Sequence, residues 1–315
     1  MRTSCIINNY NYNSYIIDAI KSALAQSVPF DEIIVVDDGS TDESLHSIRQ
    51  YVGNHERVKI IAKQNQGQLS CFNEGFSSSI GDIIFFLDAD DLYEPDYLKE
   101  ALAYYENHPQ CDFLFFAMQT FGTESRCLRP YDEDKDLGTA LMRTLHLGSK
   151  RWVGSPTSAN SIRRSILEEL LPMPEEFLKD WKTRADDCLV WGAAMLGARK
   201  CYCDKPLVRY RLHQNNNFYG RKFPFHAEVQ RLLVVNRFFS HMGSRYAALT
   251  PYDMYRITKR EFKEINKPSI QDMRDYSSTI ISLPLSIGRK IETIAFFTRK
   301  TLQEIIKTQL TPHPR

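Results

Sequence analysis

Three carboxylates stand close together in the segment Asp88–Asp91 (DADD), directly after the apolar run Phe85–Leu87. Like charges at this spacing repel one another, so the segment is unfavourable unless a cation neutralises it. Mg²⁺ and Mn²⁺ prefer oxygen ligands and share their coordination shell with phosphate groups. The segment therefore predicts a divalent-cation site and a substrate that carries a diphosphate. The alternative is that Asp90 or Asp91 only caps the helix that follows.

These carboxylates need elements that hold them in place, and the first 120 residues alternate short apolar runs with helical patterns. The strands that we expect are Ser4–Asn8, Glu32–Val36, Val58–Ala62, Asp82–Leu87 and Asp112–Met118, with helices over Ser14–Gln26, Asp42–Tyr51, Gln68–Ser77 and after Pro95. This alternation predicts βαβ units and a parallel sheet. Because ligands bind beyond the carboxyl ends of such strands, the polar segments Asn8–Asn11, Asp37–Ser40 and Asp88–Asp91 are expected to gather along one edge.

The pattern is less regular in the rest of the chain. Residues 121–136 lose their periodicity, which predicts a loop. Helices are predicted over Leu137–Leu147 and 185–197, and strands over 199–203 and 207–212. Beyond about Lys222 the pattern is mostly helical, with a break near Lys267-Pro268. The fold class that we expect is therefore α/β, followed by a helical C-terminal extension.

Charge is distributed unevenly along the 315 residues. Residues 1–120 contain 7 Lys and Arg against 18 Asp and Glu, a formal charge of −11, whereas residues 121–315 contain 33 against 21, or +12. The acidic first part argues against nucleic acid as a partner, because a phosphate backbone needs a basic surface. An acidic surface does suit a site that recruits a divalent cation.

Composition also bears on where the protein works. Hydrophobic residues make up 43% of the chain, which is enough for a sizeable core. The sequence has no uncharged apolar run long enough to predict a membrane-spanning helix. The N-terminus enters a strand pattern without the apolar region of a signal peptide. Seven cysteines, scattered from Cys5 to Cys203, do not form the pattern of a disulfide framework, and Cys201 and Cys203 lack a second pair of zinc ligands. We therefore expect a cytoplasmic protein.

Several motifs, taken in order, form a pattern that resembles the family 2 glycosyltransferases of the GT-A fold. They are Asn9–Asn11, Val35–Asp42 (VVDDGSTD), Asn65–Gln68 (NQGQ), Asn73–Phe76 (NEGF), Leu87–Asp91 (LDADD), Asp186-Asp187 and Tyr210–Asn216 (YRLHQNN). The resemblance implies a Rossmann-like, doubly wound mixed sheet with a helical C-terminal extension. It also implies a GT-A domain over 1–222, with a nucleotide-sugar-binding half over 1–120 and an acceptor-binding half over 121–222, and the extension over 223–315.

The activity implied by this resemblance is inverting transfer of a sugar from a nucleoside diphosphate donor, usually UDP-linked, to a hydroxyl of a glycan or lipid-linked glycan. Mn²⁺ or Mg²⁺ would be the cofactor. One alternative is a nucleotide-sugar binding module without catalysis. Another is a sugar-1-phosphate nucleotidyltransferase, which needs a Gly-rich basic loop after the first strand, where this chain has Asn8–Tyr12.

The resemblance also implies roles for individual residues. In the family the first acid of the DDGS segment, here Asp37, contacts the nucleotide base, and the position of Asp88 faces the ribose. The residues assigned to the nucleotide-sugar site are Asn9, Tyr10, Asp37, Asp38, Gly67, Asp88, Ala89 and Arg211, and those assigned to the metal are Asp88, Asp90 and His213. Arg211 would balance phosphate charge, with a surface salt bridge as the alternative. His213 could instead be a hydrogen-bonded histidine at a strand end.

Inverting transfer also requires a carboxylate that takes the proton of the acceptor hydroxyl. Asp186 and Asp187 are the candidates, because they open a predicted helix whose dipole favours an anion, although they could also only cap that helix. Leu189 and Gly197 stand at the family's offsets from Asp186. The second acid of such a pair is more often the base, which would be Asp187. We favour Asp186, and the sequence leaves the choice open.

The last predicted helix, over 284–310, combines an apolar stripe with basic residues. The stripe consists of Ile287, Ile291, Ile294, Thr298, Leu302 and Ile305, and the basic residues are Arg289, Lys290, Arg299, Lys300 and Lys307. A basic amphipathic helix is typical of a segment that lies on an anionic membrane surface, here the inner face of the membrane. The alternative is packing on its own domain or against a second copy in a homodimer.

Overall fold

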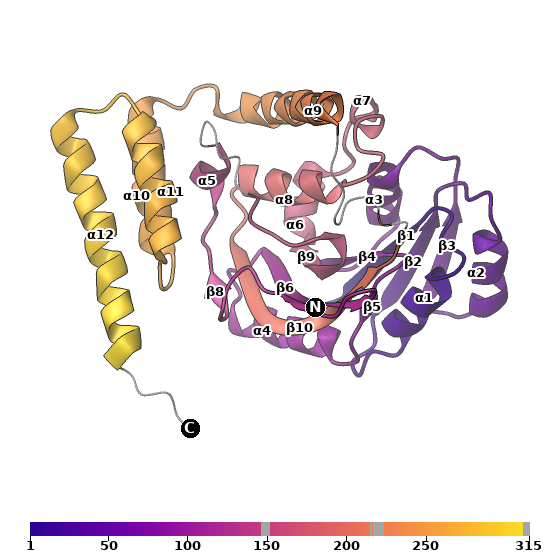
Figure 1. Ribbon diagram of the computed structural model, residues 1–315. Helices are drawn as coiled ribbons and strands as arrows, with labels where there is room; N and C mark the ends of the chain where they lie inside the picture. Colours follow the sequence, from indigo (N-terminus) through magenta and orange to yellow (C-terminus); the bar gives the residue numbers. More distant parts are fainter. Residues whose placement is uncertain (146–151, 215, 217–223, 311–315) are drawn as a thin grey trace.

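A single mixed β-sheet forms the centre of the computed structural model, which describes residues 1–145, 152–214, 216 and 224–310 (Figure 1). Its strands are β1 (Thr3–Asn9), β2 (Glu32–Asp37), β3 (Val58–Ala62), β4 (Ile83–Asp88), β5 (Leu92–Tyr93), β6 (Phe113–Gly122), β7 (Cys127–Leu128), β8 (Lys135–Asp136), β9 (Asn160–Arg163) and β10 (Lys200–Leu212).

The strand order brings the polar segments together at one edge. It runs β3-β2-β1-β4-β9-β6-β10-β5, with β7 beside β6 and β8 beside β10. The first four strands are parallel, whereas β9 is antiparallel to both of its neighbours. The register pairs Asn9 with Asp37 and Asn8 with Asp88, so the carboxyl ends of β1, β2 and β4 lie side by side. This confirms the predicted mixed α/β sheet and the gathering of polar residues at its edge.

Helices cover both faces of the sheet, because successive residues of a strand point to opposite sides. In β1, Ile6 packs in one core cluster with α3 and α8, while Cys5 and Ile7 pack in another with α1 and α4. The helices are α1 (Ile16–Leu24), α2 (Ser44–Val52), α3 (Gln68–Ser77), α4 (Tyr97–Asn107), α5 (Leu141–Leu145), α6 (Arg164–Leu170), α7 (Glu175–Leu178), α8 (Asp186–Met195), α9 (Phe225–Gly243), α10 (Pro251–Glu264), α11 (Ile270–Ser282) and α12 (Ile287–Leu310), with 3₁₀ turns η1 (Thr157–Ala159) and η2 (Ser244–Tyr246).

Several predicted elements differ from those observed. The predicted loop over 121–136 is wrong in part, since β6 continues to Gly122 and β7 and β8 lie within the range. The helix predicted from Leu137 begins only at Leu141, because Gly138 and Ala140 adopt left-handed backbone with φ of 64° and 55°. Residues 146 and 147 of that prediction lie outside the described part of the chain. The strands predicted over 199–203 and 207–212 are one strand, β10, with an irregular register between them.

None of the helices in the described part of the chain has both the length and the apolar composition that crossing a membrane requires. All seven cysteines are free thiols.

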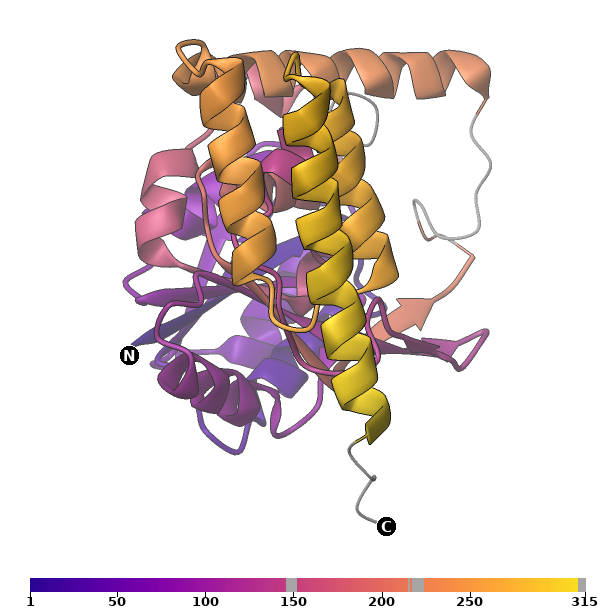
Figure 2. The ribbon, with the colours of Figure 1, turned by 90° about the vertical axis from the view of Figure 1, so that its left-hand side faces the viewer.

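Helices α10, α11 and α12 form a bundle at the end of the molecule opposite α2 (Figures 1 and 2). Its core contains the rings of Phe262, Tyr276 and Phe297. The bundle has an apolar centre of its own, separate from the two clusters that cover the sheet.

Four of the five basic side chains of α12 are engaged within the protein. Lys290 donates to the carbonyl of Ile281 (2.7 Å), and Lys300 donates to the carbonyls of Lys263 and Ile265 at the end of α10. Lys307 pairs with Glu304 of its own helix (2.8 Å). Arg289 lies over the rings of two tyrosines of α10. These contacts engage part of the positive charge of α12, whereas Ile287, Ile291 and Leu302 of the predicted apolar stripe are exposed, so contact with a membrane surface stays a prediction.

Glu261 of α10 joins this bundle to the sheet domain. Its side chain is 2% exposed. It accepts hydrogen bonds from Thr139 Oγ1 (2.5 Å), Leu141 N (2.8 Å), Met142 N (3.0 Å) and Tyr276 OH (3.2 Å). The two backbone N–H groups belong to the first turn of α5, where they have no partner within the helix. One buried carboxylate thus caps a helix of the sheet domain from the C-terminal bundle.

Replacing Glu261 with glutamine is expected to lower the free energy of unfolding by about 2–3 kcal/mol, because an amide NH₂ would then face buried donors. Urea unfolding of the full chain measures this loss. Glu264→Gln is the matched control, since Glu264 pairs with Arg199 and Arg260 near the surface, where an ion pair contributes at most about 1 kcal/mol. Equal losses in the two variants would contradict the capping role of Glu261.

Candidate active site

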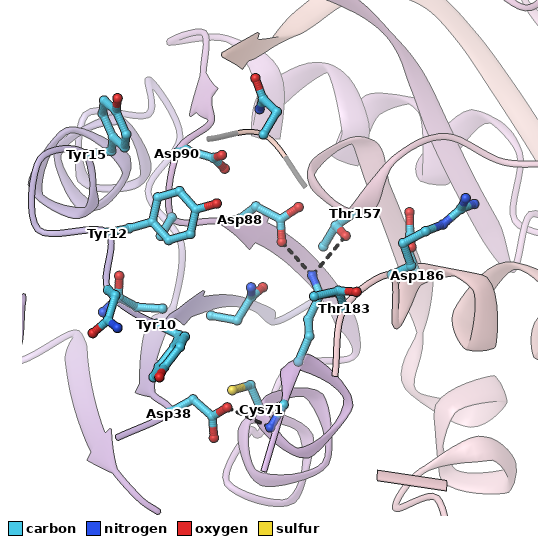
Figure 3. A pocket seen from close by; sticks show the side chains of 18 of the residues that line it. Tyr10, Tyr12, Tyr15, Asp38, Cys71, Asp88, Asp90, Thr157, Thr183 and Asp186 are labelled. Carbon is cyan, nitrogen blue, oxygen red and sulfur yellow. Dashed lines mark hydrogen bonds between the residues drawn. The ribbon is translucent and has the colours of Figure 1, made fainter. Parts of the chain in front are cut away.

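A cavity of about 860 Å³ opens at the carboxyl edge of the sheet, between the ends of β1 and β4 and the start of α8. Figure 3 shows Tyr10, Tyr12 and Tyr15 along one wall and Asp186 on the opposite one, with Asp88 between them. Eight of the predicted site residues line it: Asn9, Tyr10, Asp38, Gly67, Asp88, Ala89, Asp90 and Asp186. The other four, Asp37, Asp187, Arg211 and His213, are not in the lining, but each bonds to a residue that is.

Asp37 and Asp38 lie in different surroundings. Asp37 is fully buried and accepts hydrogen bonds from Asn9 Nδ2 (2.7 Å), Ser40 N (2.9 Å) and Ser40 Oγ (2.7 Å). Both of its oxygens therefore hold the turn after β2 against the end of β1. Asp38 lines the cavity and forms an ion pair with Lys63 at 2.5 Å. The structure places Asp38 at the cavity wall, whereas the family resemblance assigns the base contact to Asp37.

Asp88 stands at the end of β4. Its carboxylate accepts a hydrogen bond from Gln68 Nε2 (2.8 Å), and its backbone N–H donates to Ser158 Oγ (3.1 Å). Burial, followed by the negative charges of Asp90 and Asp186, raises the pKa of Asp88 to about 7. Three carboxylates thus share one cavity, an arrangement that a bound cation would stabilise.

Asp90 contacts His213, with 2.9 Å between Oδ2 and Nε2. The imidazole lies against the rings of Tyr12 and Tyr15, at centroid distances of 5.9 and 4.9 Å. His213 follows the last residue of β10, so it is a hydrogen-bonded histidine at a strand end, as the alternative stated. The same position also brings its ring nitrogen next to a carboxylate of the DADD segment.

Arg211 points away from the cavity. Its Nε donates to the backbone carbonyl of Asp90 (2.8 Å), and its guanidinium pairs with Asp18 of α1 (3.3 Å). The same guanidinium lies 4.7 Å from the ring centroid of Tyr15 and 4.6 Å from that of Phe121. The salt bridge that we kept as the alternative is therefore present, and Arg211 does not face the space where a diphosphate would bind.

The alternative in which Asp90 or Asp91 caps the next helix is wrong. The N-cap residue of α4 is Asp96. Asp91 is 1% exposed and accepts hydrogen bonds from Ser158 Oγ (2.6 Å) and from the backbone N–H of Arg211 (2.9 Å). It ties the end of β4 to the end of β10.

Within the described residues, no three His, Cys, Asp or Glu side chains converge closely enough to hold a metal ion by themselves. The structure therefore does not assemble Asp88, Asp90 and His213 into a three-ligand set. Asp90 and His213 do converge, and Mg²⁺ typically takes one or two carboxylates from a protein and its other ligands from phosphates and water. The side chains present fit a divalent ion that the protein holds jointly with a bound diphosphate.

Asp186 and Asp187 open α8, as predicted, but face different surroundings. The carboxylate of Asp187 is fully buried and pairs with Arg184 (3.0 Å) and Arg231 (3.3 Å). Asp186 lines the cavity, and its Oδ1 accepts a hydrogen bond from the backbone N–H of Asp187 (3.1 Å). Burial, followed by the charge of Asp187, raises the pKa of Asp186 to about 7. Asp186 is thus the member of the pair that faces the cavity with a pKa suited to proton transfer near neutrality.

The sequence patterns do not predict several side chains that line the cavity. They include Tyr12, Tyr15, Lys182 and Arg184, whereas Gln68 and Tyr210, which also line the cavity, stand in the motifs NQGQ and YRLHQNN. The aromatic residues that follow the first strand could have indicated a ring-lined wall. No spacing indicates Lys182 and Arg184, because the loop before α8 reaches the cavity only through tertiary packing.

A mixed α/β sheet with acidic side chains gathered at its carboxyl edge is typical of glycosyltransferases of the GT-A fold. The chain belongs to glycosyl transferase family 2, whose family model matches residues 4–171. An uncharacterized glycosyltransferase of Nostoc sp. is 33% identical over 218 residues, which are 69% of this chain and 66% of that protein. Escherichia coli chondroitin synthase is 37% identical over 99 residues, which are 31% of this chain and 14% of that protein. The chain thus spans less than two thirds of the length of these relatives.

Solved structures support the same fold. S. aureus TarS 1–349 in complex with UDP-GlcNAc superposes with a TM-score of 0.56 at 20% identity, covering 95% of this chain and 72% of that one. The mannosyltransferase PcManGT from Pyrobaculum calidifontis, in complex with GDP-Man and Mn²⁺, gives a TM-score of 0.54 at 17% identity over 96% of this chain and 84% of that one. At these identities the likeness concerns the fold alone.

Proposed function

We propose that the protein is an inverting glycosyltransferase that moves a sugar from a nucleoside diphosphate donor to a hydroxyl of a glycan or lipid-linked glycan. Among such donors we favour a UDP-sugar. The observation that carries the proposal is that Asp186, with a pKa of about 7, lines the same cavity as Asp88 and Asp90. A single displacement needs a base on one wall of the site. It also needs, on another wall, carboxylates suited to a metal ion that binds the diphosphate. Membership in family 2 supports the same reaction class.

In this mechanism Asp186 takes the proton of the acceptor hydroxyl as its oxygen attacks the anomeric carbon. The new C–O bond forms on the face opposite the diphosphate, and the bond from the anomeric carbon to the diphosphate oxygen breaks. A bound Mn²⁺ or Mg²⁺ would stabilise the charge of the leaving diphosphate. Asp90 and His213 would hold that ion, and Asp88 would accept a hydrogen bond from the ribose.

The test is a donor-hydrolysis screen with Mn²⁺ or Mg²⁺ over a panel of UDP-, GDP- and dTDP-sugars. We expect metal-dependent release of the nucleoside diphosphate from one donor. If no donor is cleaved, calorimetric titration of UDP with Mn²⁺ follows on the same sample. Tight binding there without turnover on any acceptor would favour the non-catalytic binding module. Absence of both cleavage and binding would refute the proposal.

The rate of transfer is expected to depend on pH through Asp186. Because a general base must be deprotonated, kcat/KM falls as pH decreases through about 7, the pKa to which burial and Asp187 raise this carboxyl. On the acid side the logarithm of kcat/KM should decline with a slope of about one to two per pH unit, because Asp88 titrates in the same range as Asp186. A pH series from 5.5 to 9 at saturating metal measures the profile. A flat profile between pH 5.5 and 7 would exclude a base with this pKa.

A further inference from the structure

Gln68, the first residue of α3, connects the two walls of the cavity. Its Nε2 donates to Asp88 Oδ1 at 2.8 Å, and its Oε1 accepts from the backbone N–H of Ala185 at 2.9 Å. The same Nε2 lies 3.4 Å from Thr157 Oγ1, and Figure 3 marks both of its bonds with dashed lines that end at Asp88 and Thr157. One amide therefore spans the distance from the end of β4 to the residue before Asp186.

The orientation of this amide follows from its partners. The backbone N–H of Ala185 can only donate, so it must face the carbonyl oxygen of Gln68. The amide nitrogen is then directed at Asp88, whose carboxylate accepts. Turning the amide over would place its NH₂ group against the N–H of Ala185 and its oxygen against the carboxylate of Asp88. Gln68 thus has one arrangement that satisfies both neighbours.

The backbone around Gln68 is fixed to the same loop. Gly67 has φ of 93°, and a Cβ atom there would lie 2.4 Å from the Cα atom of Lys182. The N–H of Gln68 donates to the carbonyl of Lys182 (2.9 Å), and that of Leu69 donates to the carbonyl of Trp181 (3.2 Å). The start of α3 is therefore attached to the loop that precedes α8, and the Gln68 side chain extends this attachment to the first residues of α8.

The start of α8 also needs the partner that Gln68 provides. Ala185 is the N-cap residue of α8, and its own methyl side chain cannot accept a hydrogen bond. Backbone N–H groups at a helix start have no partner within the helix. Gln68 satisfies that of Ala185 with an oxygen that comes from the other half of the site.

We infer that Gln68 is a positioning residue that holds the helix carrying the base, Asp186, at a fixed separation from Asp88. This inference rests on the proposed function for its catalytic consequence. Gln68 carries no charge and bonds to Oδ1 of Asp88, so it does not neutralise the charge of a bound diphosphate or metal. Its loss therefore changes the placement of the base relative to the donor more than it changes donor binding. Misplacement of a reacting group by about 1 Å costs on the order of 100-fold in rate.

The test compares Gln68→Met, which keeps the length of the side chain and removes its hydrogen bonds to Asp88, Thr157 and Ala185, with Gln64→Met. Gln64 is exposed and does not line the cavity. For Gln68→Met we expect kcat to fall about 30- to 100-fold, with the calorimetric Kd for UDP and Mn²⁺ within about threefold of that of the natural protein. Gln64→Met is expected to match the natural protein in both quantities. A kcat of Gln68→Met within threefold of the natural value, or a parallel loss of donor affinity, would overturn the inference.

Hydrogen exchange of the peptide that covers residues 183–192 gives a second readout that needs no activity. Loss of the acceptor for the Ala185 N–H should speed exchange at the start of α8 in Gln68→Met and not in Gln64→Met. Unchanged exchange would overturn the positioning role. If the natural protein neither cleaves any donor nor binds UDP with Mn²⁺, the proposed function fails, and the exchange result still decides whether Gln68 holds α8.

Discussion

Asp186→Asn is expected to lower kcat for sugar transfer by about 100- to 10,000-fold, the range that a positioned general base contributes. The amide keeps the size of the side chain and its place at the start of α8, but it cannot take the proton of the acceptor hydroxyl. The Kd for UDP and Mn²⁺ should change little, because Asp186 stands on the wall opposite the tyrosines (Figure 3). Steady-state transfer kinetics and calorimetry on the same preparation measure the two quantities.

Asp187→Asn is the matched comparison, since it makes the same chemical change one residue away. Asp187 is buried between Arg184 and Arg231, so its substitution leaves two guanidinium groups without their carboxylate. Because Arg184 and Arg231 are 22% and 42% exposed and water can reach them, we expect a loss of about 1–3 kcal/mol in the free energy of unfolding, seen mainly as a lower Tm. A larger loss of kcat in Asp187→Asn than in Asp186→Asn would assign the base to Asp187.

The location of the site could be predicted from the sequence because it depends on backbone topology. Parallel strands end at the same edge, and the apolar runs before Asn8, Asp37 and Asp88 are unambiguous. The register that pairs Asn9 with Asp37 and Asn8 with Asp88 follows from that arrangement. The eight predicted residues that line the cavity were found in this way or through the ordered motifs of the family.

The directions of individual side chains could not be predicted, because contacts between distant parts of the chain set them. Asp37 turns inward to Asn9 and Ser40, and Arg211 turns outward to Asp18, which lies 193 residues earlier. Asp186 lines the cavity and Asp187 does not, and this difference depends on the pairing of Asp187 with Arg231, 44 residues further along the chain. The spacing of residues within a motif does not predict contacts between residues so far apart in the chain.

Elements were missed for a similar reason. β9 (Asn160–Arg163) contains one apolar residue, Ile162, and so lacks the apolar run of a predicted strand. It forms because β4 and β6 provide hydrogen-bonding partners on both sides. The polar stretch 154–160 therefore leads into the centre of the sheet. This insertion places Ser158 against the backbone of Asp88 and the carboxylate of Asp91, and Thr157 against the Gln68 amide.

Asp90→Asn is expected to reduce metal-dependent release of the nucleoside diphosphate by at least about 100-fold at metal concentrations that saturate the natural protein. Asp90 is the carboxylate of the DADD segment that meets His213, with 2.9 Å between Oδ2 and Nε2. Asp91 cannot replace it, because both of its oxygens are bonded to Ser158 and to the backbone of Arg211. An asparagine oxygen is a weaker, neutral ligand, and the metal concentration for half-maximal activity should rise.

Titration of activity with Mn²⁺ measures this change, and Asp96→Asn is its matched control. Asp96 is the exposed N-cap residue of α4 and lies outside the cavity lining. We expect Asp96→Asn to follow the Mn²⁺ curve of the natural protein. If Asp90→Asn also follows it, Asp90 is not a metal ligand, and the cation must depend on Asp88. Asp88 lines the same cavity and is the remaining carboxylate of the segment for that purpose. Asp88→Asn would then show the shift that Asp90→Asn lacks, so the two variants together decide which carboxylate of the DADD segment holds the ion.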